Sequence, residues 1–541
     1  MSILSALTSA ITNADSYKVS HWFQYPEGTE YVSSYIEARS SKYAKTLGKD
    51  YDFAEFFGLQ AFIKEYLTKP ITQDDIDLAE LLFKAHGEPF NKEGWQYIVD
   101  KCDGKLPIEI RALPEGTVLP TSNALVEIVN TDKNCFWLTS YVETALLRAV
   151  WYPTTVATKS RAIKEICREF LDKTSDNPAA LEFMLHDFGA RGVSSNESSV
   201  LAGMAHIVNF SGTDTVMGIV GALGYYNKDF DKYLEETPDN PKRAMIKLLQ
   251  QMEKEGKPVP AFSVIASEHS TMTIEGRAGE KGQIKKLIDE AKKGKIVSIV
   301  SDSYDYYNNV ENVYGGEFKQ DILDAGKAGG RVVVRPDSGD PVEVVTKTLQ
   351  ILCEKYKDEC TTVTKGGKEY KLLPPCIRVL QGDGIDLDSL RNMLVAIEKA
   401  GFSAENMVFG MGGGLEQKVN RDDLNFAQKA SAACINGVWH DVHKDPVTAD
   451  PNFVKKSKKG RLSTIWDGVA FATKRTFDLL TGQKDQMQVV FKNGEALNTQ
   501  YFDEIRERAE YFMKRLREHD TTPVANPWTQ ASAKPAAQPG A

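Results

Sequence analysis

The fold is decided by the stretch Ile296-Val297-Ser298-Ile299-Val300-Ser301-Asp302 and by three more stretches that share its pattern. Each is a short apolar run that ends abruptly in Gly and in charged residues. The other three are Arg331-Val332-Val333-Val334-Arg335-Pro336-Asp337-Ser338-Gly339, Ile377-Arg378-Val379-Leu380-Gln381-Gly382-Asp383-Gly384 and Met407-Val408-Phe409-Gly410-Met411-Gly412-Gly413-Gly414. Runs this rich in Val and Ile predict buried parallel strands. In βα architectures ligands bind at the carboxyl ends of such strands, so the residues that end these runs are candidates for a functional site.

The spacing of these runs fits βα units, because consecutive strand ends lie about 30 to 45 residues apart. Both a closed β/α barrel and an open doubly wound sheet have this spacing. We favour the barrel, since the functional-looking residues are spread over at least four strand ends. An open sheet tends to concentrate them at one switch point.

The length and composition of the chain describe an ordinary globular protein with more than one core. Its 541 residues exceed what one hydrophobic core usually serves, and 42% of them are hydrophobic. The net charge of −9 argues against general nucleic-acid binding. The seven scattered cysteines form no C-x-x-C pair, which favours reduced thiols. We expect a cytoplasmic protein with no signal peptide and no membrane span.

The chain divides by pattern into a mixed first part, a βα part and a mixed last part. Strand-like runs occur at 31–36, 106–112 and 124–129, and 137–150 has the spacing of a buried helix. We therefore expect an α/β protein with two domains: an N-terminal α+β domain over 1–180, completed by 436–518, and an irregular β/α barrel over 181–435. Within the barrel, 227–257 is a charged insertion, and the tail 519–541, rich in Pro and Ala, is expected to be disordered.

Glycines and charged residues at the strand ends indicate an anion site. Gly412, Gly413 and Gly414 would let backbone N–H groups approach a phosphate, although a glycine triplet alone more often makes a plain turn. Arg335 can grip a phosphate with two N–H groups, and Asp337 can bind a ribose hydroxyl or a metal. Carboxylates also follow at Asp302, Asp305 and Asp383, and any one of them could simply cap a helix. Together, this set suits a sugar phosphate with Mg²⁺.

Further candidates lie in shorter motifs. His269 follows the run Phe262-Ser263-Val264-Ile265-Ala266, although a lone His is more often structural. Phe188 and Arg191 share one turn, where Phe188 is either core or a stacking face for a flat ring. Asp214 ends another strand-like run. His440 and His443 are interpreted as a solvated loop and not as a zinc site.

In this order along the chain, the motifs resemble those of the nicotinamide phosphoribosyltransferase family, which belongs to the type II phosphoribosyltransferases. The resemblance runs from about residue 14 to 508, and it departs at the insertion, at Ala190 and at Met411. The segments that carry it are Asp15-Ser16-Tyr17-Lys18-Val19, Leu185-His186-Asp187-Phe188-Gly189, Gly212-Thr213-Asp214-Thr215-Val216, Glu268-His269-Ser270-Thr271, Ser301-Asp302-Ser303-Tyr304-Asp305, Arg335-Pro336-Asp337-Ser338-Gly339, Gln381-Gly382-Asp383-Gly384 and Lys458-Lys459-Gly460-Arg461-Leu462-Ser463.

The resemblance implies an enzyme that condenses nicotinamide with 5-phosphoribosyl-1-pyrophosphate, giving nicotinamide mononucleotide and pyrophosphate in NAD salvage. It implies Mg²⁺ near Asp302 and Asp337, and ATP as an activating co-substrate that phosphorylates His269. The catalytic residues would be His269, Asp302, Arg335 and Asp337. The substrate-binding residues would be Tyr17, Arg39, Phe188, Arg191, Asp214, Ser263, Gly382, Asp383, Gly412, Gly413, Arg421 and Lys429. Of these, Tyr17, Arg39, Arg421 and Lys429 would come from the second subunit of a homodimer.

The chemistry of the residues agrees with this implied reaction. The pyridine nitrogen attacks the anomeric carbon, so the protein needs to supply positioning and charge stabilisation but no nucleophile of its own. A carboxylate at Asp214 favours an amide over the carboxylate of nicotinate. Two alternatives stay open: an enzyme that prefers nicotinate, and a non-catalytic ligand-binding or signalling dimer on the same fold.

Overall fold

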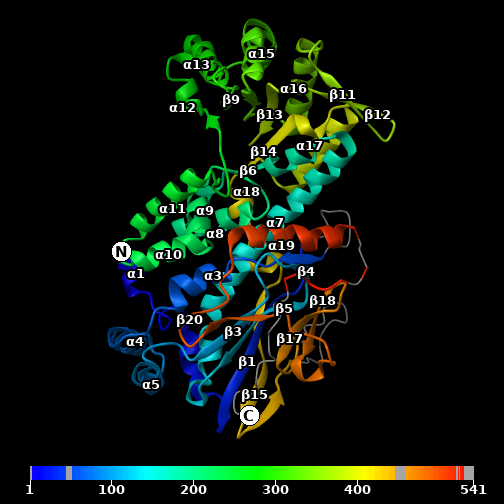
Figure 1. The fold of residues 1–541 in the computed structure, drawn as a ribbon. Coiled ribbons are helices and arrows are strands. Elements are labelled where there is room, and N and C mark those ends of the chain that lie inside the picture. The colour runs from blue at the N-terminus through cyan, green and yellow to red at the C-terminus, as the bar shows by residue number, and fades with distance from the viewer. Residues whose placement is uncertain (1–2, 44–51, 445–456, 519–521, 523, 529–541) are drawn as a thin grey trace.

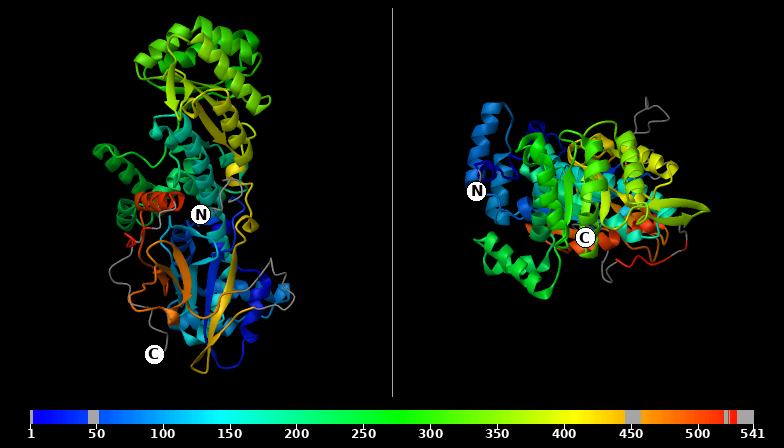
Figure 2. Two further views of the ribbon diagram at one scale, coloured as in Figure 1. Left: turned by 90° about the vertical axis from the view of Figure 1, so that its right-hand side faces the viewer. Right: turned by 90° about the horizontal axis from the view of Figure 1, so that it is seen from above.

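A computed structural model describes residues 3–43, 52–444, 457–518, 522 and 524–528 of the chain. The molecule is elongated, with one sheet toward each end and long helices between them (Figures 1 and 2). Most of the tail predicted to be disordered lies outside the described residues. Within them, no helix is both long enough and apolar enough to cross a membrane. None of the seven cysteines forms a disulfide.

The first sheet contains the four predicted strands, and all its pairings are parallel. These strands are nearly continuous apolar runs with buried centres, because helices cover the sheet. The order is β7-β6-β14-β13-β10-β9-β8. The strands are β6 Leu185–Asp187, β7 Gly212–Thr213, β8 Ile265–Ala266, β9 Ile296–Val300, β10 Arg331–Arg335, β13 Ile377–Gln381 and β14 Met407–Met411.

The two edges of this sheet meet and close it into an irregular barrel. Gly212 on β7 forms a parallel bridge with Phe262, which lies just before β8. The Thr213 N–H donates to the Phe262 carbonyl at 2.9 Å, and the Phe262 N–H donates to the Ser211 carbonyl at 2.8 Å. The expected α/β barrel is therefore confirmed. It is irregular because β7 and β8 are each only two residues long.

Helices follow most barrel strands, as βα units require. α16 begins at Pro341 with Asp340 as its N-cap, and α17 begins after Asp386, which forms a capping box with Ser389. The helices of this half are α8 Asn196–Ile207, α9 Val216–Tyr225, α10 Lys228–Glu236, α11 Pro241–Glu255, α12 His269–Met272, α13 Gly276–Ala291, α14 Tyr306–Asn308, η6 Asn309–Glu317, α15 Lys319–Lys327, α16 Pro341–Lys355, α17 Leu387–Lys399 and α18 Gly413–Glu416. A hairpin of β11 Thr361–Lys365 and β12 Lys368–Leu372 follows α16.

The second sheet is antiparallel and is built from both ends of the chain. Its order is β16-β15-β1-β5-β3-β19-β20, which brings N-terminal strands between C-terminal ones. The predicted strands at 31–36, 106–112 and 124–129 are confirmed as β1, β3 and β5. The strands are β1 Thr29–Ala38, β3 Ile108–Ala112, β5 Asn123–Asn130, β15 Ala427–Ile435, β16 Val438–Asp441, β19 Gln488–Lys492 and β20 Glu495–Ala496. Two small antiparallel sheets of two strands each complete this half: β2 Phe53–Glu55 with β4 Val118–Pro120, and the hairpin of β17 Leu462–Trp466 with β18 Phe471–Arg475.

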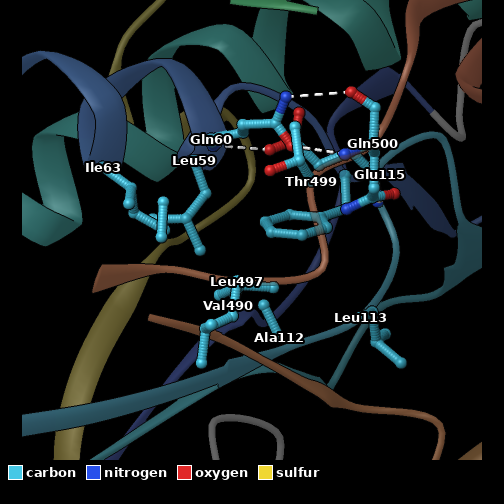
Figure 3. A pocket seen from close by; sticks show the side chains of 12 residues that line it. Leu59, Gln60, Ile63, Ala112, Leu113, Glu115, Val490, Leu497, Thr499 and Gln500 are labelled. Carbon is cyan, nitrogen blue, oxygen red and sulfur yellow. Dashed lines mark hydrogen bonds between the residues drawn. The ribbon is translucent and has the colours of Figure 1, made fainter. Parts of the chain in front are cut away.

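Buried polar contacts join the N-terminal and C-terminal segments. Figure 3 shows Gln60 and Gln500 bonded to each other: Gln60 Nε2 donates to the Gln500 carbonyl at 2.9 Å, and the Gln500 N–H donates to Gln60 Oε1 at 2.7 Å. Beside them, the Glu115 carboxylate accepts the Gly58 and Gln60 N–H groups at 2.8 and 2.7 Å. The cavity that these residues line has a volume of about 10 Å³, enough for one water and no more. This junction is therefore structural.

One long helix, α7 Glu143–Thr174, connects the two halves (Figure 1). It continues well beyond the predicted helix at 137–150, which the structure divides into α6 Leu138–Tyr141 and the start of α7. Pro153 lies inside α7, where proline usually breaks a helix. Most α7 residues after Pro153 are buried, so packing outweighs the lost hydrogen bond. α7 contacts α8, α17 and α18, and so supports the turn after β14.

The insertion at 227–257 folds into the helix pair α10 and α11, which lies on the outside of the barrel half (Figure 1). Phe230, Leu248 and Met252 form a small core with Leu223 of α9. The remaining elements are α1 Ile3–Leu7, η1 Ser16–Phe23, α3 Leu59–Phe62, η2 Ile63–Leu67, α4 Gln73–His86, α5 Lys92–Cys102, η3 Lys133–Cys135, η4 Pro178–Phe183, η5 Ala190–Gly192, η7 Ala404–Asn406, η8 Arg421–Asp423, η9 Thr476–Asp478 and α19 Phe502–Arg517.

Candidate active site

Residues from three neighbouring strand ends meet around Asp302, which follows β9. Its Oδ1 lies 2.9 Å from Nε2 of His269, the first residue of α12 after β8. Its Oδ2 accepts the Asp337 N–H at 3.1 Å and the Ser338 hydroxyl at 2.6 Å, both from the turn after β10. The Asp302 side chain is 5% exposed, whereas that of His269 is 48% exposed. Asp302 thus holds two loops together and leaves the imidazole accessible.

The two carboxylates of this cluster differ in their protonation behaviour. Burial would raise the pKa of Asp302, but hydrogen bonds from Ser338, His269 and the Asp337 N–H outweigh it and hold that pKa below its usual value. Burial raises the pKa of Asp337, opposed by Arg335 and reinforced by the Asp302 and Asp383 carboxylates. Negative charge is therefore concentrated at the ends of β9, β10 and β13.

Arg335 is the last residue of β10 and lies at the edge of this cluster. Its Nη2 donates to the Ser267 carbonyl at 3.1 Å, and its Nε lies 3.5 Å from Asp337 Oδ1. The side chain is 13% exposed. Nε is buried and makes no hydrogen bond among the described residues. The guanidinium is therefore fixed in place with donor capacity left for an anion.

Phe188, in the turn after β6, lies across the ends of two other strands. Its N–H donates to the Met411 carbonyl at 2.9 Å, which ties the turn to β14. A Cβ at Gly410 would come within 2.1 Å of the ring, so only glycine fits beneath it. A Cβ at Gly382 would lie 3.4 Å from the same ring. The ring is half-buried, so one part of it remains available at the barrel mouth.

Asp214 and Ser263 meet where the barrel closes. Asp214 follows β7 and Ser263 precedes β8, and the Ser263 hydroxyl donates to Asp214 Oδ1. The Asp214 N–H donates to the carbonyl of Asp187 at 2.9 Å, one residue before Phe188. Both side chains are exposed. Asp214 therefore offers an exposed carboxylate on a loop whose backbone is bonded to the residue before Phe188.

The glycine turn after β14 packs against the turn that carries Arg191. A Cβ at Gly192 would lie 2.9 Å from the Gly413 Cα, so the two backbones are in close contact. Arg191 and Asp383 are exposed, and Gly382, Gly412 and Gly413 are partly exposed. Asp305, in contrast, caps α14 by accepting the Asn308 N–H at 3.1 Å. Of the strand-end carboxylates, this one has the structural role.

Four expected site residues are carried by other parts of the protomer. Arg39 directly follows β1, Lys429 lies on β15, Arg421 begins the turn before β15, and Tyr17 lies in η1. Arg39 Nε donates to the Asn425 carbonyl at 2.8 Å. Burial, together with the positive charge of Arg39, Lys444 and Lys458, lowers the pKa of Lys429. Tyr17 is 53% exposed. These residues form a basic region on the antiparallel sheet and one exposed aromatic ring.

Sequence reasoning missed four groups that organise the site. Ser338 and Ser267 hold Asp302 and Arg335, and Glu416 and Lys159 lie behind the glycine turn. Ser338 belongs to the Pro-Asp-Ser-Gly motif, so its position was a signal. The other three carry no local signal, because their contacts join residues far apart in the sequence. His440 and His443 are exposed, and among the described residues no group of three His, Cys, Asp or Glu side chains is arranged to hold a metal.

Comparison with known proteins identifies the family. Residues 183–495 match the sequence model of the Nicotinate phosphoribosyltransferase (NAPRTase) family, and residues 9–110 match that of the Nicotinamide phosphoribosyltransferase, N-terminal domain. The nicotinamide phosphoribosyltransferase of Xanthomonas campestris pv. campestris is 43% identical over 93% of this chain and 98% of its own. That of Acinetobacter baylyi is 32% identical over 91% of this chain and 95% of its own. Among solved structures, the nicotinate-nucleotide pyrophosphorylase from Pyrococcus furiosus shares the fold at a TM-score of 0.55 and 13% identity, covering 96% of this chain and 98% of its own.

The sequence matches cover both halves of the molecule, the antiparallel sheet and the barrel. The barrel half contains the parallel strands whose ends carry His269, Asp302, Arg335 and Phe188. The chain therefore belongs to the nicotinamide phosphoribosyltransferase family.

Proposed function

We propose that this enzyme condenses nicotinamide with 5-phosphoribosyl-1-pyrophosphate to give nicotinamide mononucleotide and pyrophosphate, as a step of NAD salvage. The observation that carries the proposal is that Phe188 and Asp214 follow two neighbouring strands, β6 and β7, of a barrel whose other strand ends carry Arg335, Asp337 and glycines. An aromatic face with an adjacent carboxylate suits a pyridine carboxamide. The names of the relatives at 43% and 32% identity support the same reaction.

The base would bind between two aromatic rings. Phe188 would provide one face, and Tyr17 of the partner subunit would provide the other, since Tyr17 is exposed on its own protomer. The Asp214 carboxylate would accept a hydrogen bond from the carboxamide NH₂. Ser263, which donates to Asp214, would hold that carboxylate in place.

The phosphoribosyl donor would lie along the strand ends from β8 to β14. Arg335, Arg191 and His269 would contact the pyrophosphate, and Asp337, Gly382 and Asp383 would bind the ribose hydroxyls. The 5-phosphate would bind at Gly412 and Gly413, together with the basic residues Arg39, Arg421 and Lys429 of the partner subunit. The position of Arg335 at the end of β10 and the basic region on the antiparallel sheet support this division.

The carboxylates Asp302 and Asp337 fit a Mg²⁺ ion. Mg²⁺ is usually held by one or two carboxylates together with substrate phosphates, and not by an all-protein cage. The raised pKa of Asp337, caused by burial and by Asp302 and Asp383, indicates uncompensated negative charge that a divalent cation would relieve. When bound, Mg²⁺ would neutralise charge that builds up on the pyrophosphate.

The reaction needs positioning and charge stabilisation from the protein. Bond breaking leaves positive charge on the ribose and negative charge on the pyrophosphate, where Arg335 and Arg191 would act. The attacking atom is the pyridine nitrogen, which Phe188 and Asp214 would aim. His269 is half exposed and held by Asp302, which suits the expected phosphorylation by ATP. That step would couple ATP hydrolysis to turnover.

The proposal is tested by turnover of both bases with Mg²⁺, with and without ATP. Faster conversion of nicotinate would favour the nicotinate alternative. Purified protein that forms no nicotinamide mononucleotide would favour a non-catalytic binding protein.

Replacing Asp214 with serine is expected to reduce the preference for nicotinamide over nicotinate by about tenfold or more, because a like-charge repulsion against nicotinate is removed. The measurement is the ratio of kcat/KM for the two bases. Asp239→Asn, in an exposed loop of the insertion, is the matched control and should leave the ratio unchanged. An unchanged ratio in Asp214→Ser would contradict the assigned role of Asp214.

The shared site predicts complementation between inactive subunits. Phe188→Ala and Tyr17→Ala are each expected to be nearly inactive, since each loses one face of the base site. Mixed dimers would contain one site with neither substitution and should recover up to about one quarter of the wild-type activity at random exchange. Activity after denaturation and refolding of the mixture is the readout. Sedimentation as a monomer would contradict the shared site.

A further inference from the structure

A buried acid, Glu416, lies beneath the turn that presents Phe188. Glu416 is the last residue of α18, the short helix formed by the glycine turn after β14. A Cβ at Gly189 would come within 2.5 Å of the Glu416 Cδ, so this acid is pressed against the Phe188 turn. Its carboxyl lies beside that of Asp187, the last residue of β6, and both residues are fully buried. The two turns are thus joined by a pair of acids.

The surrounding donors define which acid carries a proton. Asp187 accepts the Gly189 N–H at 2.8 Å and the Thr213 hydroxyl at 3.4 Å, so it has the donors that an ionised carboxylate needs. Glu416 Oε1 accepts the Thr215 hydroxyl at 3.3 Å. Glu416 Oε2 is buried and meets no N–H or O–H donor among the described residues. A proton on Glu416 that is donated to Asp187 satisfies this oxygen and avoids two adjacent buried charges.

The electrostatic surroundings agree with a neutral Glu416. Burial and the Asp187 carboxylate raise the pKa of Glu416 to about 10. His186 and His206 lie near Asp187, and burial lowers the pKa of both imidazoles, that of His186 to about 4. They are therefore neutral near pH 7 and do not compensate a second negative charge.

Two side chains of α7 hold the same turn from behind. Tyr152 donates its hydroxyl to the Glu416 carbonyl at 2.9 Å. Lys159 donates to the Gly414 carbonyl and lies 3.5 Å from the Lys418 carbonyl. Burial lowers the pKa of Lys159 to about 8. The glycine turn therefore contacts α7 on one side and, through Glu416, the Phe188 turn on the other.

We propose that Glu416, as a neutral carboxylic acid, is a positioning residue that clamps the Phe188 turn to the glycine turn. This inference builds on the proposed function, in which these turns bind the base and the 5-phosphate. The clamp then sets the separation between the ring of the base and the phosphate end of the ribose. Such spacing matters because a misplacement of about 1 Å can lower a rate about 10²-fold.

The test compares Glu416→Gln with Glu416→Leu. The glutamine amide can donate to Asp187 as the acid does, so Glu416→Gln should keep kcat and both KM values within about threefold of wild type. Leucine has a similar volume and no donor. Glu416→Leu should lower kcat/KM by about tenfold or more, with higher KM values for both nicotinamide and the phosphoribosyl donor. All values are normalised to folded protein, measured by thermal melting.

The controls separate positioning from stability. Glu317→Gln alters an exposed glutamate that pairs with Lys281 and should change nothing. Should Glu416→Leu fail to fold, Thr215→Val removes only the donor to Oε1 and should raise both KM values about twofold to threefold. The clamp is refuted by unchanged KM and kcat in the folded Glu416→Leu variant, or in Thr215→Val if that must stand in for it. An equal loss of kcat/KM in Glu416→Gln and Glu416→Leu would also refute it. Wild-type enzyme in the same assay tests the proposed reaction separately, because its failure to form the mononucleotide would overturn the function and not the clamp.

Discussion

An Asp302→Asn variant is expected to lose about 10²-fold or more in kcat while remaining folded. Asp302 accepts from His269 on one oxygen and from the Asp337 N–H and the Ser338 hydroxyl on the other. An asparagine keeps one acceptor and turns the other into a donor, which then opposes one of these groups. It also removes a charge from the proposed Mg²⁺ site. Steady-state kinetics with saturating substrates and Mg²⁺ measures the loss.

Two further variants make this experiment specific. Ser338→Ala removes a single hydrogen bond to Asp302 and should have a smaller effect than Asp302→Asn. Asp358→Asn changes an exposed turn aspartate and should leave kcat at the wild-type value. If Asp302→Asn kept kcat within about threefold of wild type, the cluster would not be the catalytic centre.

An Arg111→Met variant is expected to lose about 3–5 kcal/mol of unfolding free energy. Arg111 on β3 pairs with Glu127 on β5 and with Asp485 of the C-terminal segment, and it donates to the Leu462 carbonyl at 2.8 Å. The side chains of Arg111 and Glu127 are 5% and 1% exposed. Removing the arginine leaves the negative charge of the buried carboxylates only partly balanced, although Arg461 still contacts Glu127 at 2.8 Å. Urea denaturation at pH 7 measures the loss.

The same pair predicts a pH dependence. Burial would raise the pKa of Glu127, but Arg111 and Arg461 hold it well below its usual range. A depressed pKa stabilises the fold above the unfolded-state pKa of about 4.3, and this contribution is lost as the pH falls toward the folded-state pKa. The difference in unfolding free energy between wild type and Arg111→Met should therefore become smaller as the pH falls from about 5 toward about 3. The control Lys281→Met breaks an exposed ion pair and should lower the unfolding free energy by at most about 1 kcal/mol. A similar loss of unfolding free energy in Lys281→Met and Arg111→Met would contradict the role of the buried pair.

The barrel strands could be predicted closely because their signal is local. β9, β10, β13 and β14 are continuous apolar runs that end in Gly or charge, and each strand begins and ends within the run that predicted it. The closure of the barrel could not be predicted in the same way. β7 and β8 have two residues each, and they are strands only because Gly212 meets Phe262 across a long loop of chain.

The site residues show the same contrast between local sequence signals and long-range contacts. The residue types at the strand ends, such as Arg335 and Asp302, indicate phosphate and ribose chemistry from the sequence alone. Their partners are less visible: Ser338 is marked only by the Pro-Asp-Ser-Gly motif, and Ser267 carries no signal of its own. Asp305 and Asp302 look alike in the sequence, yet one caps a helix and the other joins His269 to the β10 turn.

The α/β class, the four buried strands and the kinds of groups at their ends follow from the sequence, because hydrophobic runs and glycine turns act over a few neighbouring residues. Which of these groups are in contact depends on long-range folding. It paired His269 with Asp302, brought Arg111 to the C-terminal segment, and buried Glu416 against Asp187. Glu416 illustrates the physical reason: next to a glycine turn it looks like an ordinary solvated acid. Its proton and its clamping role arise only when folding removes water and places a second carboxylate beside it.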